Sequence, residues 1–252
     1  AVDQGGVCCA VIPHGSCCGA HRASLRWLPA LGLAARQPFA TKAITSGGYH
    51  RALMLEQRIQ QHFIDSADLK YQAAQVLSQP IAAAVHAILA CVTSGGKVLA
   101  CGNGPSAAEA QQFAAFCVAG FERDRPELAA MALTADSTLL TASSSGPDMS
   151  SQQFARQVRA LGQAGDVLLA LSVSGNDANL LAATEAAHER DMTVIVLSGR
   201  TGGRLAAVLR ETDVLINVPH DRAARVREVH ALVLHCISDG VDAQLLGDQE
   251  IS

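Results

Sequence analysis

The stretch DVLLALSVSGNDAN, residues 166–179, joins an uninterrupted aliphatic run to a cluster of serine, glycine and asparagine. An apolar run without polar alternation is typical of a strand that is buried on both faces of a parallel sheet. In such sheets, ligands bind beyond the carboxyl ends of the strands, where loops lead into helices. We therefore expect Ser172 and Ser174 to lie in a binding site at the end of a buried strand.

Four other short segments have the same apolar character, and helical stretches separate them. They are KVLACG (97–102), ELAAMAL (127–133), TVIVLSG (193–199) and DVLINVP (213–219). Strands that alternate with helices imply right-handed crossovers and a parallel sheet covered by helices. We predict an α/β fold, a three-layer, doubly wound parallel sheet of about five strands, closed by a long helix over residues 222–246.

The chain before the first strand has two parts. Apolar residues at helical spacing from Met54, and again after Pro80, predict two amphipathic helices. Residues 1–53 have paired cysteines, dispersed glycine and proline, and no sustained periodicity. We expect residues 1–53 to be an atypical extension, disordered or not native, and residues 54–252 to be one domain with N-terminal helices.

Composition limits the classes of partner. The chain has 252 residues, a net charge of -4 and no block of lysines or arginines, so direct nucleic-acid binding is not expected. No apolar run reaches the ~18 residues of a membrane span, so no membrane association is expected. Four cysteines lie in apolar surroundings and predict buried free thiols of a reducing, cytoplasmic protein. They are Cys91, Cys101, Cys117 and Cys236.

Two loops follow the first and third predicted strands, CGNGPSAAEA (101–110) and SVSGNDAN (172–179). Hydroxyls and glycine amides at helix N-termini suit a phosphate group. Neither loop contains GxGxxG or GxxxxGK[ST], which disfavours a simple nucleotide enzyme. Explanations without a ligand also exist: Ser106 and Glu109 have the spacing of a capping box, and Asp177 is a possible N-cap.

The two loops, with RAARVREVHALVLH on the last helix, resemble the sugar isomerase (SIS) domain, in its phosphoheptose isomerase branch. The resemblance extends over about residues 54–246. It implies that the protein is a homotetramer built partly on the N-terminal helices, and that its ligand is a phosphorylated sugar. The binding residues it implies are Asn103, Gly104, Ser106, Ser172, Ser174, Gly175 and Asn176.

The resemblance also implies a zinc-assisted isomerase centre, with a His-x-x-x-Glu pair after the first loop and a Gln and a His on the last helix. Here these positions hold Gln112, Phe116, Arg227 and His235. Phenylalanine takes no proton, and the arginine cation does not ligate a metal. We therefore assign no catalytic residue, expect no zinc or other cofactor, and interpret His235, the only remnant, as a packed or interface histidine.

Within the family the chain looks still more like the DiaA regulators, which associate with the replication initiator DnaA. FERDRPELAAMAL (121–133) and HDRAARVREVH (220–230) carry this similarity. We predict a non-catalytic, phosphosugar-binding regulator that binds a DnaA-type initiator, with Leu245 and Leu246 as candidate partner contacts.

Two alternatives remain. The first is a phosphoheptose isomerase that converts sedoheptulose phosphate to a heptose phosphate with an altered active site, for which Glu109 is the nearest carboxylate. The second is a transcriptional regulator. It is disfavoured because residues 1–53 contain no helix-turn-helix pattern.

Overall fold

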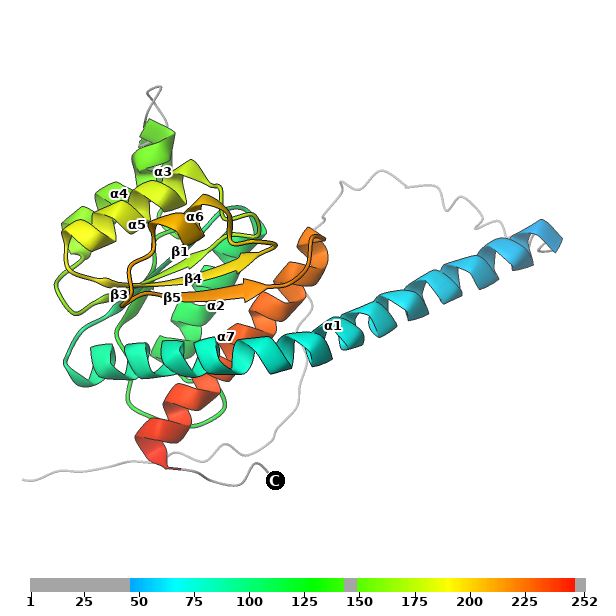
Figure 1. The fold of residues 1–252 in the computed structure, drawn as a ribbon, viewed down its shortest axis with the longest axis horizontal. Coiled ribbons are helices and arrows are strands. Elements are labelled where there is room, and N and C mark those ends of the chain that lie inside the picture. The colour runs from blue at the N-terminus through cyan, green and yellow to red at the C-terminus, as the bar shows by residue number, and fades with distance from the viewer. Residues whose placement is uncertain (1–45, 143–148, 248–252) are drawn as a thin grey trace, which may run out of the picture. The chain divides into compact units, whose positions relative to one another are not determined.

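The structure, a computed structural model, describes residues 46–142 and 149–247. A long helix, α1 (Ser46–Thr93), precedes a parallel sheet, and helix α7 (Ala223–Leu246) follows it (Figure 1). The elements between them are β1 (Val98–Gly102), α2 (Pro105–Ala119), β2 (Ala130–Ala132), α3 (Ser137–Ala142), α4 (Met149–Leu161), β3 (Val167–Leu171), α5 (Ala178–Glu189), β4 (Thr193–Gly199), α6 (Gly203–Val208) and β5 (Val214–Val218). The five predicted strands and the long final helix are confirmed.

The sheet has the order β2-β1-β3-β4-β5, and all neighbouring strands are parallel. The chain moves outward from β1 to β2, then returns to the other side of β1 with β3, so the sheet is doubly wound. In the register of β1 and β3, Gly102 lies opposite Leu171. These two strands therefore end side by side at the point where the winding reverses, which is the usual ligand site of such sheets.

Each face of the sheet carries its own hydrophobic core, because successive strand residues point to opposite faces. Val98 and Ala100 of β1 belong to a cluster with α1, α2 and α7. Leu99 and Cys101 belong to a second cluster, with α4, α5 and α6. Figure 1 shows these two groups of helices on opposite sides of the sheet, which confirms the predicted three-layer architecture.

Helix α1 is one continuous helix, so the prediction of two helices separated at Pro80 is wrong. Proline removes one backbone hydrogen bond and usually kinks or ends a helix. Here Leu77 before it and Ala84 and Ile88 after it are buried in the same core cluster. Packing on both sides of Pro80 therefore holds the helix together. The expected extension of residues 1–53 falls mostly on residues 1–45, outside the described part of the chain, and stays a prediction.

By length and composition alone, the segment Leu53–Thr93 of α1 is apolar enough to cross a membrane. Part of this apolar character belongs to the protein core, because Leu69, Leu77 and Ile88 pack against the sheet. The expectation of no membrane association stays a prediction.

The four cysteines of the described chain are free. Cys91, Cys101 and Cys117 are buried, as predicted, and burial raises the pKa of the Cys91 thiol to about 11. Cys236 is exposed, so its prediction as a buried thiol is wrong. Its neighbours Val233 and Ile237 take the core-facing positions of α7, whereas Cys236 lines an open pocket beside α1.

A buried ion pair joins the loop after α2 to α7. Arg125 and Asp242 pair through side chains that are each 2% exposed. The same guanidinium donates hydrogen bonds to the carbonyl oxygens of Phe116 and Cys117 in the last turn of α2. Arg125 thus anchors the C-terminal end of α2 to the final helix.

Replacing Asp242 with alanine is expected to lower the free energy of unfolding by about 3–5 kcal/mol, because it leaves the Arg125 cation buried without its partner. Asp239→Ala, three residues earlier on the same helix, is the matched control and is expected to change it by less than about 0.5 kcal/mol. Urea unfolding of both variants measures the difference. Equal losses of stability in the two variants would show that the ion pair does not contribute to the free energy of unfolding.

His230 on α7 is fully buried, and its Nε2 lies 3.1 Å from the carbonyl oxygen of Ser198. Because a carbonyl only accepts, Nε2 carries the proton of the neutral ring. Burial lowers the pKa of His230 to about 4. Protons therefore bind the unfolded chain more readily than the folded one, and stability present above the unfolded pKa of about 6.5 is lost as the pH falls toward 4.

The His230 contribution is expected to lower the free energy of unfolding by about 2 kcal/mol between pH 7 and pH 5. His230→Asn removes the titrating group. The free energy of unfolding of this variant is therefore expected to fall by about 2 kcal/mol less than that of the wild type between pH 7 and pH 5. His86→Asn, at an exposed position of α1, serves as the control and keeps the wild-type slope. Denaturant unfolding at both pH values provides the test, and identical slopes for all three proteins would contradict it.

Candidate functional site

The loops that follow β1 and β3 meet at the carboxyl edge of the sheet and line a cavity of about 200 Å³. Helix α7 closes the cavity with Arg227, a half-buried cation. The other lining residues are Asn103, Pro105, Ser106, Leu171, Ser172, Val173, Ser174 and Asp177. The structure therefore brings together four of the predicted binding residues, Asn103, Ser106, Ser172 and Ser174, from two loops about 70 residues apart in the chain.

The first loop turns sharply from β1 into α2. Gly104 is the N-cap, with a φ of 54°, and Pro105 is the first helical residue. Gly102 also has to be glycine, because a Cβ there would lie 2.6 Å from the carbonyl oxygen of Ser106. Ser106 therefore lies inside the first turn, not at the cap, and no side chain caps this helix. The capping-box interpretation of Ser106 and Glu109 is wrong.

The second loop is fixed by its own hydrogen bonds. The Ser172 hydroxyl donates to the carboxylate of Asp177 and accepts from the amide of Gly175 at 2.8 Å. The Ser174 hydroxyl accepts from the amide of Asn176 at 3.3 Å. Gly175 and Asn176, two of the predicted binding residues, thus support the serines and do not line the cavity.

Asp177 connects the two loops. It is the N-cap residue of α5, as predicted, but its side chain makes no capping hydrogen bond. Instead, its carboxylate accepts from Ser172 and, at 3.1 Å, from the amide of Asn103. Asn103 and Asn179 also exchange a pair of amide hydrogen bonds, of 2.9 and 2.8 Å. Sequence reasoning gave Asp177 only a capping role and missed its contact with the first loop. Its position close to two loop serines was the available signal for a role in the site.

A second carboxylate lies beside the cavity. Glu109 on α2 is half-buried, accepts a hydrogen bond from the Ser106 hydroxyl and interacts electrostatically with Arg227. Burial raises the pKa of Glu109, while the Ser106 hydrogen bond and the Arg227 charge oppose this rise. Its Oε2 atom is buried and has no hydrogen-bond partner among the described residues.

The positions where the family resemblance implies a zinc centre form an aromatic contact instead. The ring of Phe116 packs edge-on against Phe121 and His235, with centroid distances of 4.9 and 5.6 Å. This agrees with the prediction of His235 as a packed histidine. Arg227 lies about two turns away from His235 on α7.

These residues do not fit a zinc ion. The phenylalanine ring offers no lone pair, and the arginine remains cationic, so only Gln112 and His235 of the four positions carry a donor atom. In the part of the chain that the structure describes, no group of three or more His, Cys, Asp or Glu side chains is placed to hold a metal.

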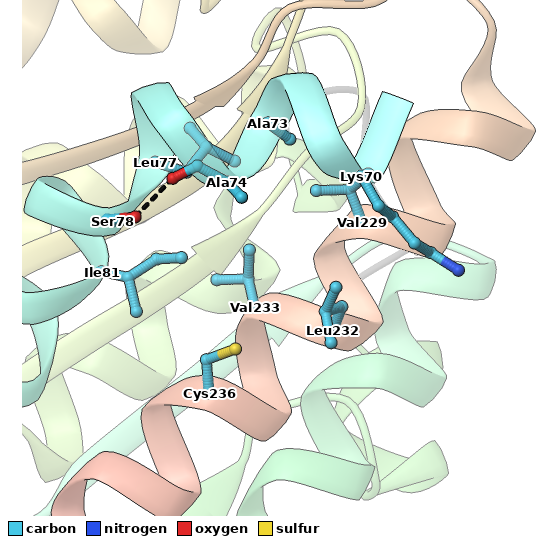
Figure 2. A pocket seen from close by; sticks show the side chains of 10 residues that line it. All are labelled: Lys70, Ala73, Ala74, Leu77, Ser78, Ile81, Val229, Leu232, Val233 and Cys236. Atoms are coloured by element: carbon cyan, nitrogen blue, oxygen red, sulfur yellow. Dashed lines mark hydrogen bonds between the residues drawn. The ribbon is translucent and has the colours of Figure 1, made fainter. Parts of the chain in front are cut away.

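A separate, apolar pocket of about 280 Å³ lies between α1 and α7. Figure 2 shows Leu77 and Ile81 of α1 near Val233 and Cys236 of α7 around this space. Further along α1, Phe63 is 74% exposed. Such apolar exposure agrees with burial between subunits, but the homotetramer itself stays a prediction.

The predicted partner contacts lie at the end of α7. Leu245 and Leu246 are both exposed there. Their use as a contact stays a prediction.

Comparison with known proteins gives a consistent result. A family model for the SIS domain matches residues 61–199. The chain is 62% identical over 199 residues to a phosphoheptose isomerase from Methylibium petroleiphilum, covering 79% of this chain and 99% of that protein. It is 51% identical over 191 residues to one from Dechloromonas aromatica, covering 75% and 96% of the two chains.

The solved structures agree. The phosphoheptose isomerase GmhA from Neisseria gonorrhoeae has 49% identity and a TM-score of 0.71, covering 75% of this chain and 99% of that one. A phosphoheptose isomerase from Francisella tularensis has 41% identity and the same TM-score of 0.71, covering 74% and 97%.

These findings correct the function predicted from the sequence. The prediction of a non-catalytic regulator that binds DnaA is wrong, because proteins that are 51–62% identical to this chain are named as an enzyme. The comparisons with these relatives give no support to a role in replication initiation. Since the SIS model matches more than half of the chain and the relatives align over nearly their whole length, the chain belongs to the SIS-domain proteins, in the phosphoheptose isomerase family.

Proposed function

We propose that the protein is a phosphosugar isomerase that interconverts a ketose phosphate and an aldose phosphate, with sedoheptulose phosphate as its substrate. The observation that carries the proposal is the cavity at the reversal point of the sheet, where loop serines and the N-terminus of α2 meet. The relatives that share this fold at 41–62% identity are named phosphoheptose isomerases.

The cavity suits the phosphate end of such a substrate. The N-terminus of α2 supplies a partial positive charge, and anions bind readily at this end of a helix. Ser106 and Ser174 line the cavity, and serine hydroxyls can donate hydrogen bonds to phosphate oxygens. The Asp177 carboxylate accepts hydrogen bonds from Asn103 and Ser172, so its charge helps to hold the loops together.

The reaction itself needs few groups. A proton moves from C1 of the ketose to C2, and a hydroxyl proton moves between the two oxygens, through an enediolate. This requires a base near C1 and a positive charge or hydrogen-bond donor near the developing oxyanion. Arg227 of α7 lines the cavity, and Glu109 of α2 lies beside it. We also place the protein in the cytoplasm, a reducing compartment that suits its free thiols.

Turnover is the direct test of this proposal. The full chain is incubated with sedoheptulose 7-phosphate, with and without added zinc, and the aldose product is followed by NMR. We expect turnover, and we expect Ser174→Ala to raise KM about tenfold with little change in kcat, because phosphate contacts are made equally in substrate and transition state. Ser94→Ala, an exposed serine after α1, is the control. No turnover beside an active relative in the same assay would contradict the proposal.

A glycine pair tests whether the second loop forms the binding site. Gly175 has a φ of +68°, and a Cβ there would lie 1.9 Å from the carbonyl oxygen of Gly202. Gly165 has a similar φ of +87° but open space around it. Each alanine variant is expected to lose about 1–2 kcal/mol of stability from the left-handed backbone.

Only Gly175→Ala also displaces the loop, so only this variant is expected to weaken sugar phosphate binding, by at least tenfold. Isothermal titration calorimetry of both variants measures the effect. Equal affinities would show that the loop is not part of the site.

A further inference from the structure

Helix capping does not explain the position of Glu109. It does not cap α2, because the helix begins at Pro105 with Gly104 as its N-cap. Its Oε2 is buried and without a hydrogen-bond partner among the described residues. Leaving a buried carboxylate oxygen unpaired costs stability, so the position is expected to have another use.

The surroundings of Glu109 place it at the wall of the cavity. Ser106, which hydrogen-bonds to it, and Arg227, which interacts with it electrostatically, both line the cavity. The carboxyl group therefore lies next to two side chains that line the cavity. To reach a bound sugar, Glu109 has to change its side-chain torsions.

Asp177 is the other carboxylate at the cavity, and it is less suited to proton transfer. Its two oxygens accept hydrogen bonds from Asn103 and Ser172. These bonds occupy both oxygens of Asp177 and help to hold the two loops together. Glu109 has a free oxygen, and its change of protonation leaves the loop contacts intact.

Arg227 occupies a position where the family resemblance implies a zinc ligand. Its guanidinium is permanently cationic and carries several N–H donors, so it stabilises a developing oxyanion without a metal. The residues at the implied zinc positions, with Phe116 among them, do not fit that ion. The chain therefore has a cationic side chain at the site but lacks a set of residues that could bind zinc.

We propose that Glu109 is the base of this isomerase and that Arg227 stabilises the enediolate, so that the reaction proceeds without a metal ion. The inference rests on the isomerase function proposed above. The Glu109 carboxylate takes the proton from C1 of the ketose, and the C–H electron pair forms the C1–C2 double bond while the carbonyl electrons move to O2. Glu109 then returns the proton to C2, the hydroxyl proton passes from O1 to O2, and the C1 aldehyde forms.

The pH dependence has a definite direction. Burial raises the pKa of Glu109, and the charged groups near it are Arg227 on α7 and, across the cavity, Asp177. A base acts only when deprotonated, so kcat/KM falls as the pH drops through this raised pKa. The acidic limb of the profile therefore lies above the usual range of a glutamate.

The experiment compares three variants of the full chain with sedoheptulose 7-phosphate. Glu109→Gln is expected to lower kcat by about 10²–10⁴-fold and to remove the acidic limb, while affinity by calorimetry stays within about twofold. Arg227→Gln is expected to lower kcat by about 10²–10³-fold, and Arg227→Lys to recover part of that loss. Glu185→Gln, an exposed glutamate on α5, keeps wild-type activity. EDTA is expected to leave the wild-type rate unchanged.

The outcomes separate this inference from the proposed function. An inactive wild-type protein would overturn both. A wild-type protein whose activity is lost with EDTA and restored by zinc, or a Glu109→Gln variant as active as wild type, would overturn the inference and leave the isomerase function in place. Loss of ligand affinity in Glu109→Gln, together with its activity, would also overturn it, because Glu109 would then be needed for the site itself.

Discussion

The parallel pairing of β1 with β3 is the constraint on which the rest of the structure depends. Their register sets Gly102 opposite Leu171, so both strands end at the same point of the sheet. The chain reverses its winding between them, so the two loops lead into helices on opposite faces of the sheet and leave a crevice between them. The cavity, the α2 N-terminus and the loop serines are all consequences of this one pairing.

The loops are then held together by polar contacts. Asn103 of the first loop bonds to Asp177 and Asn179 of the second, and Ser172 bonds to Asp177. These bonds fix the side chains that line the cavity before any ligand arrives, so little ordering entropy is lost on binding. Helix α7 completes the site with Arg227, and the Arg125–Asp242 ion pair holds α2 against that helix.

The sequence was sufficient to predict the three layers of the fold and most of the residues of the candidate site. Fully apolar strands such as VLLAL predict a parallel sheet, and serines at their ends predict a ligand. Three points depended on tertiary packing and were missed. Leu77 and Ile88 are buried in the core on either side of Pro80, α2 begins with Gly104 as its N-cap, and Asp177 accepts a hydrogen bond from Asn103. The absent zinc ligands suggested an inactive protein. The sequence did not show that Glu109 and Arg227 lie near each other, because the two residues are far apart in the chain and no local pattern links them.

The central claim is that the two loops form the binding site for a phosphorylated sugar. A crystal structure of the full chain with sedoheptulose 7-phosphate tests it most directly. The account predicts the phosphate group between the N-terminus of α2 and the Ser174 hydroxyl, with the sugar extending toward Arg227. A phosphate group bound elsewhere, or a loop cavity left empty at saturating ligand, would contradict it.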